Sequence, residues 1–366
     1  SFFIEAMELF LTIPNRINFL QMGRFGRSSE QRFRMNFRKK FDWISFNRTL
    51  VQEGKPNRRA IAIDPSYICK SGKKTPGVGY FWSGCASAVK WGLELMGFAL
   101  VDADAGTGVH LVAKQTFTDK VKGAVPYYLK HMDDHNTIIG IYLRTIHSLK
   151  DDLLKLSDCL VADAFFSKET FVTGAKALGF NVISRLRDDV RLKYLYTGPK
   201  TGKKGRPKKF TGPVDLKSLD KSVFVTTSLE DVILHSAVVW AVSLKREVKV
   251  VIADYIDPEK KTQSRKVFFS TDTGMNAMDI LKFTGQDSRS SFSTEIASNS
   301  RDCATASQGM PKQWTLHSTC LSPQSTLPDS LGKTMAWICP SAMSNCSYTM
   351  LLWLNEYFQR SEKART

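Results

Sequence analysis

Short apolar runs rich in β-branched residues recur along the chain, and each of them predicts a buried strand. The first run, Ala60–Ile68, contains Asp64 and is interrupted by Pro65, which we expect to stop the strand. A second run, Leu160–Phe166, repeats this design around Asp163. The pattern therefore predicts two buried strands that each carry one carboxylate at the tip.

A carboxylate at the end of a buried strand loses hydration, which is costly unless a cation or another partner compensates the charge. Asp64 alone fits two explanations: it holds a metal ion, or it caps the turn after the strand. Taken alone, the cap is the simpler explanation, and the second copy at Asp163 shifts the balance towards a metal site. Asp102 and Asp104 read as turn residues, with support of the Asp64 site as the alternative.

The first 58 residues combine helical patterns with many basic residues. Phe33, Phe37 and Phe41 recur at helical spacing, which predicts one amphipathic helix over residues 31–43 with its Phe stripe on the core. Its basic face has two open explanations, a solvated surface or contact with phosphates. The candidate nucleic-acid-binding residues of this region are Arg24, Arg34, Arg38, Lys39 and Lys40.

Alternating helix and strand patterns follow the first run. Trp91–Val101 and Gly108–Val112 predict strands joined by Gly-rich links, as hairpins require. Residues 119–158 predict helix, Lys168–Phe180 a helix that ends at a Gly, and Asn181–Leu186 the next strand. A three-stranded antiparallel start followed by alternating helix and strand, with carboxylates at the tips of strands one and four, is the layout of an RNase H-like α/β fold.

Further along, the chain turns strongly basic and then rich in strand patterns. Residues 221–270 predict a β-rich insertion, and a helix is expected at Asn276–Leu281. The basic loop has the sequence Gly-Arg-Pro flanked by lysines, which suits an A·T-rich minor groove; a flexible solvated loop explains it equally well. Its candidate nucleic-acid-binding residues are Lys203, Lys204, Arg206, Lys208 and Lys209.

Composition favours a nucleic-acid partner. The 366 residues carry a formal net charge of +17, which indicates a polyanionic partner, and no apolar run approaches the ~20 residues that span a bilayer. Seven cysteines without a C-x-x-C pair fit reduced thiols and favour neither a disulfide framework nor a zinc site. The first residues lack both the basic segment of a signal peptide and an initiator Met, which favours a truncated N-terminus.

Together these segments resemble bacterial insertion-sequence DDE transposases. The similarity lies in Ala62-Ile63-Asp64, in Val161-Ala162-Asp163-Ala164-Phe165-Phe166-Ser167-Lys168 and in Phe269-Ser270-Thr271-Asp272, and covers roughly residues 20–283. The branch is the insertion-sequence-four family, in which a β-rich domain interrupts the RNase H-like fold before the third carboxylate. The expected parts are a helical basic N-terminal region (1–58), the first part of the core (59–190), the β-rich insertion with its basic loop (191–270), the start of the third-carboxylate helix (271–283) and a tail (284–366).

The resemblance also implies chemistry and partners. Asp64 and Asp163 would ligate two Mg²⁺ or Mn²⁺ ions, with Asp64 bridging both, because hard cations prefer oxygen ligands. The substrate would be double-stranded DNA, both element ends and target, and the protein would act as a homodimer assembled on DNA. The expected location is the bacterial cytoplasm, at the nucleoid.

The family's catalytic Glu belongs to the signature Y-x-x-R-x-x-x-E-x-x-x-x-x-x-K, which is absent from this sequence. Back-translation of residues 283–300, read one base earlier, permits Y-R-T-R-F-Q-I-E-F-F-Y-R-D-S-K-Q-F without a forced stop. This string contains all four signature residues at the family's spacing, with the Glu codon across Ser290 and Ser291. We therefore expect that one base was lost near Phe283, and that residues 284–366 are out of frame and poorly ordered.

The tail's composition agrees with a change of frame. Between Cys303 and Met350 only Lys312, Asp329 and Lys333 are charged, whereas Ser, Thr and Cys are abundant. The alternative is a genuine Ser/Thr-rich tail that happens to back-translate well. Glu295 lies about 6 Å further along a helix than the missing ligand would, and we do not assign it that role.

The sequence leaves three functions open. The first is a DDE transposase by descent that binds DNA but is inactive in this frame. The second is another RNase H-like nuclease, which the β-rich residues 221–270 disfavour. The third is a non-catalytic DNA-binding protein that uses the basic N-terminal region and the Lys203–Lys209 loop.

Overall fold

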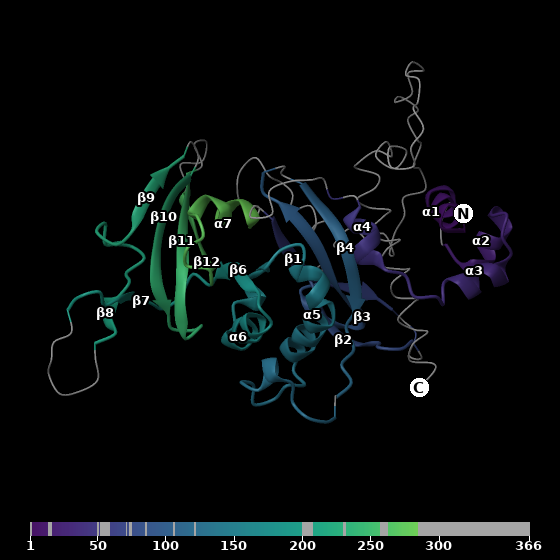
Figure 1. Ribbon diagram of the computed structural model, residues 1–366, viewed down its shortest axis with the longest axis horizontal. Coiled ribbons are helices and arrows are strands. Elements are labelled where there is room, and N and C mark those ends of the chain that lie inside the picture. Colours follow the sequence, from purple (N-terminus) through teal and green to yellow (C-terminus); the bar gives the residue numbers. More distant parts are fainter. Residues whose placement is uncertain are drawn as a thin grey trace, which may run out of the picture.

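The computed structural model describes residues 2–13, 17–49, 51, 59–70, 72, 75–84, 86–104, 107–120, 122–199, 208–229, 232–256 and 263–284. Within this part of the chain, helices surround one large mixed sheet of twelve strands (Figure 1). The tail expected to be out of frame lies outside the described residues from residue 285 on. None of the described helices is long and apolar enough to cross a membrane.

The long strand β3 (Ala88–Asp102) organises the first part of the sheet. It pairs antiparallel with β1 (Arg59–Cys69) along one edge. Its other edge is shared by β2 (Gly79–Ser83) and β4 (Thr107–Gln115), which pair with successive parts of β3. The predicted strands at residues 60–68, 91–101 and 108–112 are therefore confirmed, and β2 is a further strand that the pattern did not indicate.

Two short parallel strands complete the first half of the sheet. The crossover helix α5 (Ile138–Leu154) leads into β5 (Cys159–Val161), and α6 (Glu169–Ala177) leads into β6 (Asn181–Leu186). β5 pairs in parallel with both β1 and β6. Gly179, at φ +96°, turns the chain out of α6, where a residue with a Cβ would be strained. The order β3-β1-β5-β6 is consistent with the predicted RNase H-like core.

The strands after β6 extend this sheet and do not form a separate one. β12 pairs antiparallel with β6, and the order continues as β12-β11-β10-β7-β8. β9 pairs antiparallel with residues 233–236 of β10. The helix α7 (Ala277–Phe283) follows β12 and begins at the cap Asn276. The bounds of the added strands are β7 Leu192–Leu195, β8 Phe210–Pro213, β9 Val225–Ser228, β10 Val232–Ala241, β11 Arg246–Ile256 and β12 Gln263–Ser270.

The two faces of the sheet are covered by different helices. Ile61 and Ile63 of β1 belong to the large core that also contains buried residues of α5 and α6. Ala60, on the opposite face of β1, belongs to a second core together with Val161 and Ile280 of α7. In β1 and β5, every second residue counted from Ala60 or from Val161 therefore faces the side of the sheet that α7 covers.

The N-terminal region folds into four short helices that pack through aromatic side chains. Phe33 and Phe37 are buried, as predicted. The single helix predicted over residues 31–43 is wrong, because α3 ends at Asn36 and a new helix begins at Trp43 under the Asp42 cap, whose carboxylate accepts the Ser45 N–H at 3.0 Å. The helix bounds are α1 Phe2–Thr12, α2 Phe19–Phe25, α3 Glu30–Asn36 and α4 Trp43–Arg48.

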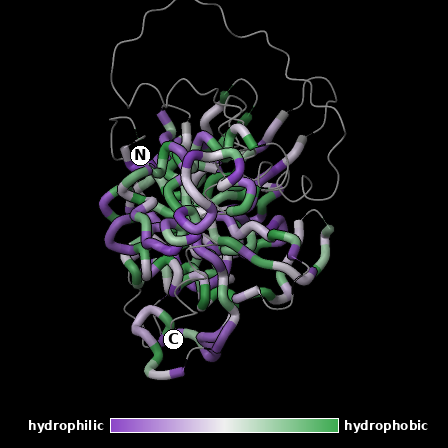
Figure 2. The backbone as a smooth tube through the Cα atoms, turned by 90° about the vertical axis from the view of Figure 1, so that its right-hand side faces the viewer, coloured by the Kyte–Doolittle hydropathy of each residue, from purple (hydrophilic) through white to green (hydrophobic). Residues whose placement is uncertain are grey.

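Phe41, the third member of the predicted stripe, lies between the two helices and is 36% exposed. Its ring stacks on Phe3 with a centroid distance of 5.1 Å. α4 is joined to the sheet by Asn47, whose Nδ2 donates to the Leu111 carbonyl at 2.9 Å. Figure 2, which views the molecule from the N-terminal side, shows hydrophobic and hydrophilic residues mixed along these elements.

Two further boundary predictions are wrong. Pro65 does not stop the first strand, because β5 has already ended where Pro65 lies, so its missing N–H removes no bond to that neighbour. Residues 119–120 and 122–126 are not helical; in the predicted helical segment 119–158, helix is confined to a short 3₁₀ turn at Tyr127–Leu129 and to α5.

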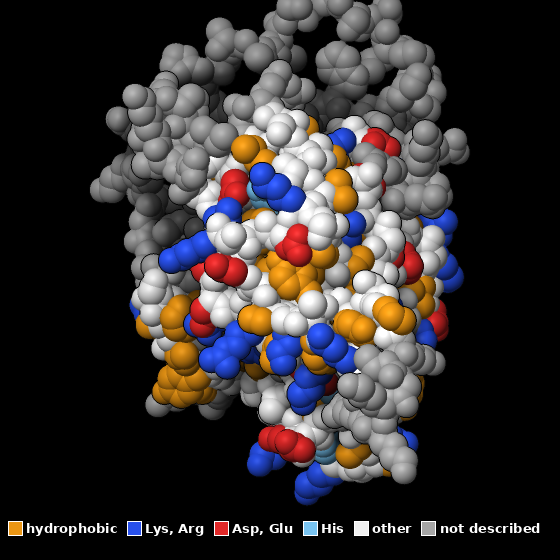
Figure 3. Space-filling model, turned by 90° about the vertical axis from the view of Figure 1, so that its left-hand side faces the viewer, with side chains coloured by type: hydrophobic (Ala, Val, Ile, Leu, Met, Phe, Trp, Pro, Cys, Tyr) orange, Lys and Arg blue, Asp and Glu red, His pale blue; other side chains and the backbone are white. Residues whose placement is uncertain are grey.

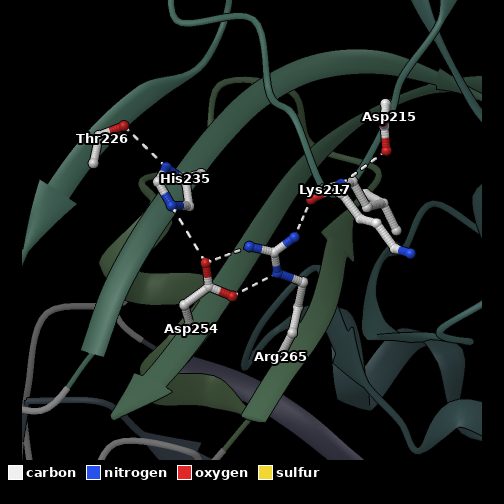
Figure 4. Close-up of polar contacts among 7 residues, drawn as sticks. Asp215, Lys217, Thr226, His235, Asp254 and Arg265 are labelled. Carbon is white, nitrogen blue, oxygen red and sulfur yellow. Dashed lines mark hydrogen bonds and ion pairs between the residues drawn. The ribbon is translucent and has the colours of Figure 1, made fainter. Parts of the chain in front are cut away.

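A polar network ties four of the added strands to a loop (Figure 4). Thr226 and His235 are hydrogen-bonded at 2.9 Å, and His235 Nε2 lies 3.5 Å from Asp254 Oδ2. Both carboxylate oxygens of Asp254 accept hydrogen bonds from the Arg265 guanidinium at 2.6 Å, and Arg265 also donates to the Leu216 carbonyl. The network spans β9 to β12, so it holds the outer strands in register.

Candidate active site

Asp64 and Asp163 occupy equivalent positions beside each other on two parallel strands. The last paired positions of β1 and β5 are Ala62 and Val161, and each Asp lies two residues beyond its member of this pair. Neighbouring strands are about 4.8 Å apart, and residues two apart share a face. The register therefore directs both carboxylates to the α7 side of the sheet, where Val161 packs.

Asp163 is fixed by its backbone and by the turn that it caps. Its Oδ1 accepts the N–H of Phe165 at 3.1 Å, and its carbonyl accepts the Ser184 hydroxyl of β6 at 2.7 Å. Desolvation by the surrounding protein raises the pKa of this carboxyl although part of it is open to solvent, and the Phe165 N–H and the Lys168 charge oppose the rise. A bound cation would relieve this strain on the ionised form.

A buried pair on the other side of the sheet supports this end of the structure. The Tyr142 hydroxyl on α5 donates to Glu94 Oε1 of β3 at 2.8 Å. The Tyr142 ring lies against Phe166, with centroids 5.5 Å apart, and Phe166 is three residues after Asp163. Burial, followed by the charges of Glu94, Asp163 and Asp64, raises the pKa of Tyr142, so the hydroxyl remains a donor.

The geometry agrees with one family of proteins. A family model described as DDE superfamily endonuclease matches residues 38–238, more than half of the chain, and this segment includes Asp64 and Asp163. This chain belongs to the DDE superfamily endonuclease family. No curated protein matches the chain. Membership implies a DNA substrate and a function of the transposase or nuclease type.

Asp64 and Asp163 are candidate oxygen ligands for a divalent metal ion. Asp64 and Asp163 offer hard carboxylate donors from adjacent strands, which fits the divalent metals that this superfamily usually uses. Among the residues that the structure describes, no group of three or more His, Cys, Asp or Glu side chains could hold a metal ion.

Lys168 is a basic side chain that the sequence did not single out as a site residue. Its Nζ lies 3.6 Å from the centroid of the Phe165 ring, and its charge acts on Asp163. Burial lowers the pKa of Lys168, and Asp163 opposes this change. Lys168 thus places a positive charge near Asp163.

Asp102 and Asp104 were given an alternative role, support of the Asp64 site, and their contacts do not favour it. Asp102 forms an ion pair with Arg59 at 3.1 Å, and it also accepts the backbone N–H of Asp104. Arg59 begins β1 five residues before Asp64, a separation of about 17 Å along a strand. Asp102 and Asp104 therefore stabilise the end of β1 that is distant from Asp64, which is the role expected of turn residues.

The basic candidates lie on the surface, away from the carboxylates. Arg24, Arg34, Arg38, Lys39 and Lys40 are exposed, although Arg34 Nε donates to Glu30 at 2.8 Å and Lys39 to Asn36 at 3.0 Å. Lys208 and Lys209 are exposed beside β8, and Lys203, Lys204 and Arg206 lie outside the described residues. Figure 3 looks onto the β-rich end of the molecule, where several Lys and Arg side chains gather.

Sequence reasoning missed Glu94, Tyr142 and Lys168, although one of them carried a signal. Glu94 interrupts the apolar run Trp91–Val101 in the same way as Asp64 interrupts its own strand. Tyr142 resembles any aromatic residue of an amphipathic helix, and only its position against Phe166 gives it a role.

We predict that Glu94→Gln changes the pH dependence of stability. Burial raises the pKa of Glu94, outweighing the hydrogen bonds from Tyr142 and Thr116, so the folded state binds more protons than the unfolded state above about pH 4.5. The contribution of Glu94 to wild-type stability should fall as the pH rises from about 4.5 to the raised pKa of Glu94, by up to about 1.4 kcal/mol per pH unit. Gln cannot ionise, so urea unfolding should show an advantage for Glu94→Gln that grows with pH and then levels off.

The exposed Glu247→Gln is the matched control, because it removes the same charge from another strand of the sheet. A constant difference between Glu94→Gln and wild type from pH 4.5 to pH 8 would contradict the prediction.

Proposed function

We propose that this chain is an insertion-sequence transposase of the insertion-sequence-four branch whose third carboxylate has been lost through a change of reading frame. The observation that carries the proposal is the equivalent placement of Asp64 and Asp163 on β1 and β5. The family match supports the coarser part, a DDE endonuclease acting on DNA. The finer parts rest on the two motifs and on the signature permitted by the other frame.

In this proposal each described residue has a limited task. Asp64 and Asp163 present oxygen atoms to divalent ions, while the Phe165 N–H and the Ser184 hydroxyl hold Asp163 in place. Divalent ions held there would supply activation of a water or a 3′-hydroxyl and stabilisation of the leaving oxygen of a phosphodiester. Tyr142 and Glu94 keep the segment after Asp163 packed on α5.

The position of α7 supports the proposed source of the third ligand. Ile280, Leu281 and Phe283 bury α7 in the core on the face that Asp64 and Asp163 share. In the alternative frame the Glu would follow Phe283 by seven or eight residues, about 11 Å of helix. A helix that continued α7 would therefore carry this Glu along the same side of the sheet.

Two other functions would share these features in part. A non-catalytic DNA-binding remnant would keep the net charge of +17 and the exposed basic residues without performing any chemistry. Another RNase H-like nuclease would keep the Asp pair, but it gives no reason for the six strands after β6. Metal-dependent strand transfer by the repaired chain separates the three.

The first prediction of the proposal concerns the DNA that encodes the chain. Sequencing across the codons for residues 278–300 should reveal one additional base, a T in the run at Phe283, that restores the reading Y-R-T-R-F-Q-I-E. If the DNA confirms the present frame and the host makes this protein at full length, the proposed source of the third carboxylate is wrong.

The second prediction concerns the frame-restored protein. It should cleave and join DNA carrying its element ends in the presence of Mg²⁺, and Asp64→Asn or Asp163→Asn should reduce this activity to background while DNA binding persists. Asp152→Asn is the matched control, because Asp152 is exposed on α5 and paired only with a surface lysine at 3.0 Å. Loss of DNA binding in the Asp64 variant would instead assign Asp64 a structural role.

A further inference from the structure

Phe165 contacts two charged side chains of the candidate site at once. Its backbone N–H donates to Asp163 Oδ1 at 3.1 Å, and its ring lies under the Lys168 ammonium, with Nζ 3.6 Å from the ring centroid. Asp163 is the cap that precedes the 3₁₀ turn Ala164–Phe166, and Lys168 is the cap that precedes α6. The turn therefore holds a carboxylate and an ammonium near each other at the end of β5.

This turn is anchored in the core of the protein. Phe166 is buried, and its ring centroid lies 4.7 Å from that of Phe171 on α6. The Ser167 hydroxyl is hydrogen-bonded to the Ser184 hydroxyl at 3.0 Å, and the Lys168 N–H donates to the Phe166 carbonyl at 2.8 Å. The backbone of Lys168 is thus fixed relative to Asp163, as a binding residue requires.

Neutralisation of Asp163 is the simplest task for Lys168, and the geometry does not favour it. A lysine with this task alone would bring its ammonium into an ion pair with the carboxylate. In the part of the chain that the structure describes, Lys168 and Asp163 form no ion pair, and the ammonium lies on the Phe165 ring instead. The charge of Lys168 still acts on Asp163 from this position.

The ammonium is accessible to an anion in this position. Lys168 is exposed, and Phe165 is a large apolar side chain that is 42% exposed. A ring face supports a cation without neutralising it, and it occupies only one side of an ammonium that has three N–H donors. The DNA substrate that the family implies would bring a phosphate, an anion with several acceptor oxygens, to this end of the sheet.

We propose that Lys168 binds a non-bridging oxygen of the DNA phosphodiester that lies beside Asp163. The inference rests on the proposed function for its choice of DNA as the anion, but it needs neither the third carboxylate nor catalysis. The contact would be a charge-assisted hydrogen bond from Nζ to the phosphate. It would offset the repulsion between the phosphate and the Asp163 carboxylate, and Phe165 would support the ammonium from the opposite side.

This role differs from that of the other exposed basic residues. The candidates of the N-terminal region and of the β8 loop would add general attraction for DNA at a distance from the carboxylates. Lys168 would instead fix where the DNA backbone passes Asp163. A lysine suits contact with a single phosphate because its ammonium is a compact point charge.

The test is DNA binding by the full chain as it exists, measured by fluorescence anisotropy with a labelled duplex in Mg²⁺ at several salt concentrations. Lys168→Met removes the charge and keeps the stem of the side chain. It should bind the duplex about fivefold more weakly at 0.1 M salt, and the slope of log affinity against log salt should fall by about one, because one phosphate contact is lost.

Two further variants make this loss specific. Lys168→Arg keeps the charge, so its affinity should stay within about twofold of wild type. Lys176→Met is the matched control, because Lys176 is an exposed lysine of the same helix that donates to Asn181 at 2.8 Å. Its affinity should also stay within about twofold of wild type. Equal losses in Lys168→Met and Lys176→Met, wild-type affinity of Lys168→Met, or no duplex binding by the wild type would overturn the inference.

An Asp163→Asn background separates phosphate binding from neutralisation of Asp163. If Lys168 binds the phosphate itself, adding Lys168→Met to Asp163→Asn should again weaken binding about fivefold. If Lys168 only neutralises Asp163, its substitution should have no effect once that charge is gone. The second result would overturn the inference.

Another measurement needs no substitution and so does not depend on the folding of a variant. Acetylation of lysines in the wild-type chain, mapped by mass spectrometry, should show that duplex DNA protects Lys168 while Lys176 stays reactive. Equal acetylation of Lys168 with and without DNA would overturn the inference. Protection of Lys168 together with a frame-restored protein that neither cleaves nor joins DNA would leave this inference intact and reject the proposed function instead.

Discussion

The parallel pairing of β1 with β5 is the constraint on which the site depends. The pairing comprises only two residue pairs, Ile61 with Leu160 and Ala62 with Val161. A slip by one residue would turn Asp163 to the opposite face of the sheet and separate it from Asp64. Such a short strand cannot define its register alone, so contacts outside it must do so.

Hydrogen bonds at both ends of β5 fix its register. The Ser157 hydroxyl donates to the Arg59 carbonyl at 2.7 Å before the strand begins. After it ends, the Ala162 N–H donates to Ile183 at 3.0 Å and the Ser184 hydroxyl to the Asp163 carbonyl at 2.7 Å. The carboxylate pair is therefore aligned by hydrogen bonds to the neighbouring strands on both sides.

The charges around this point are arranged in an order that suits a polyanion and a cation together. Asp64 and Asp163 form a negative centre, with Lys168 close to Asp163. The Phe165 ring supports the Lys168 ammonium, with Nζ 3.6 Å from the ring centroid. A phosphodiester would be repelled by two bare carboxylates, and both a bound metal and Lys168 would offset that repulsion.

Most strands, and the two central Asp residues, could be predicted from the sequence because each strand has a simple local pattern. The apolar runs gave β1, β3 and β6, and the Gly at position 179 gave the end of α6. Asp64 and Asp163 were distinguishable because a carboxylate in an apolar run is unusual.

Features that depend on tertiary contacts could not be predicted in the same way. Pro65 continues β1 only because β5 ends beside it, and the Phe stripe breaks at Phe41 because Asp42 caps a new helix. The pairing of β12 with β6, which joins the added strands to the first half of the sheet, depends on residues about eighty positions apart. No local pattern contains that information.

We propose that the Asp64 and Asp163 carboxylates share one of the bound cations. The most direct measurement is an anomalous difference map from crystals of this chain soaked in Mn²⁺. The account predicts a peak within bonding distance of a carboxylate oxygen from each of the two residues, and its loss in Asp64→Asn crystals. Ordered Asp64 and Asp163 carboxylates that point to opposite faces of the sheet, or a Mn²⁺ peak at only one of them, would contradict it.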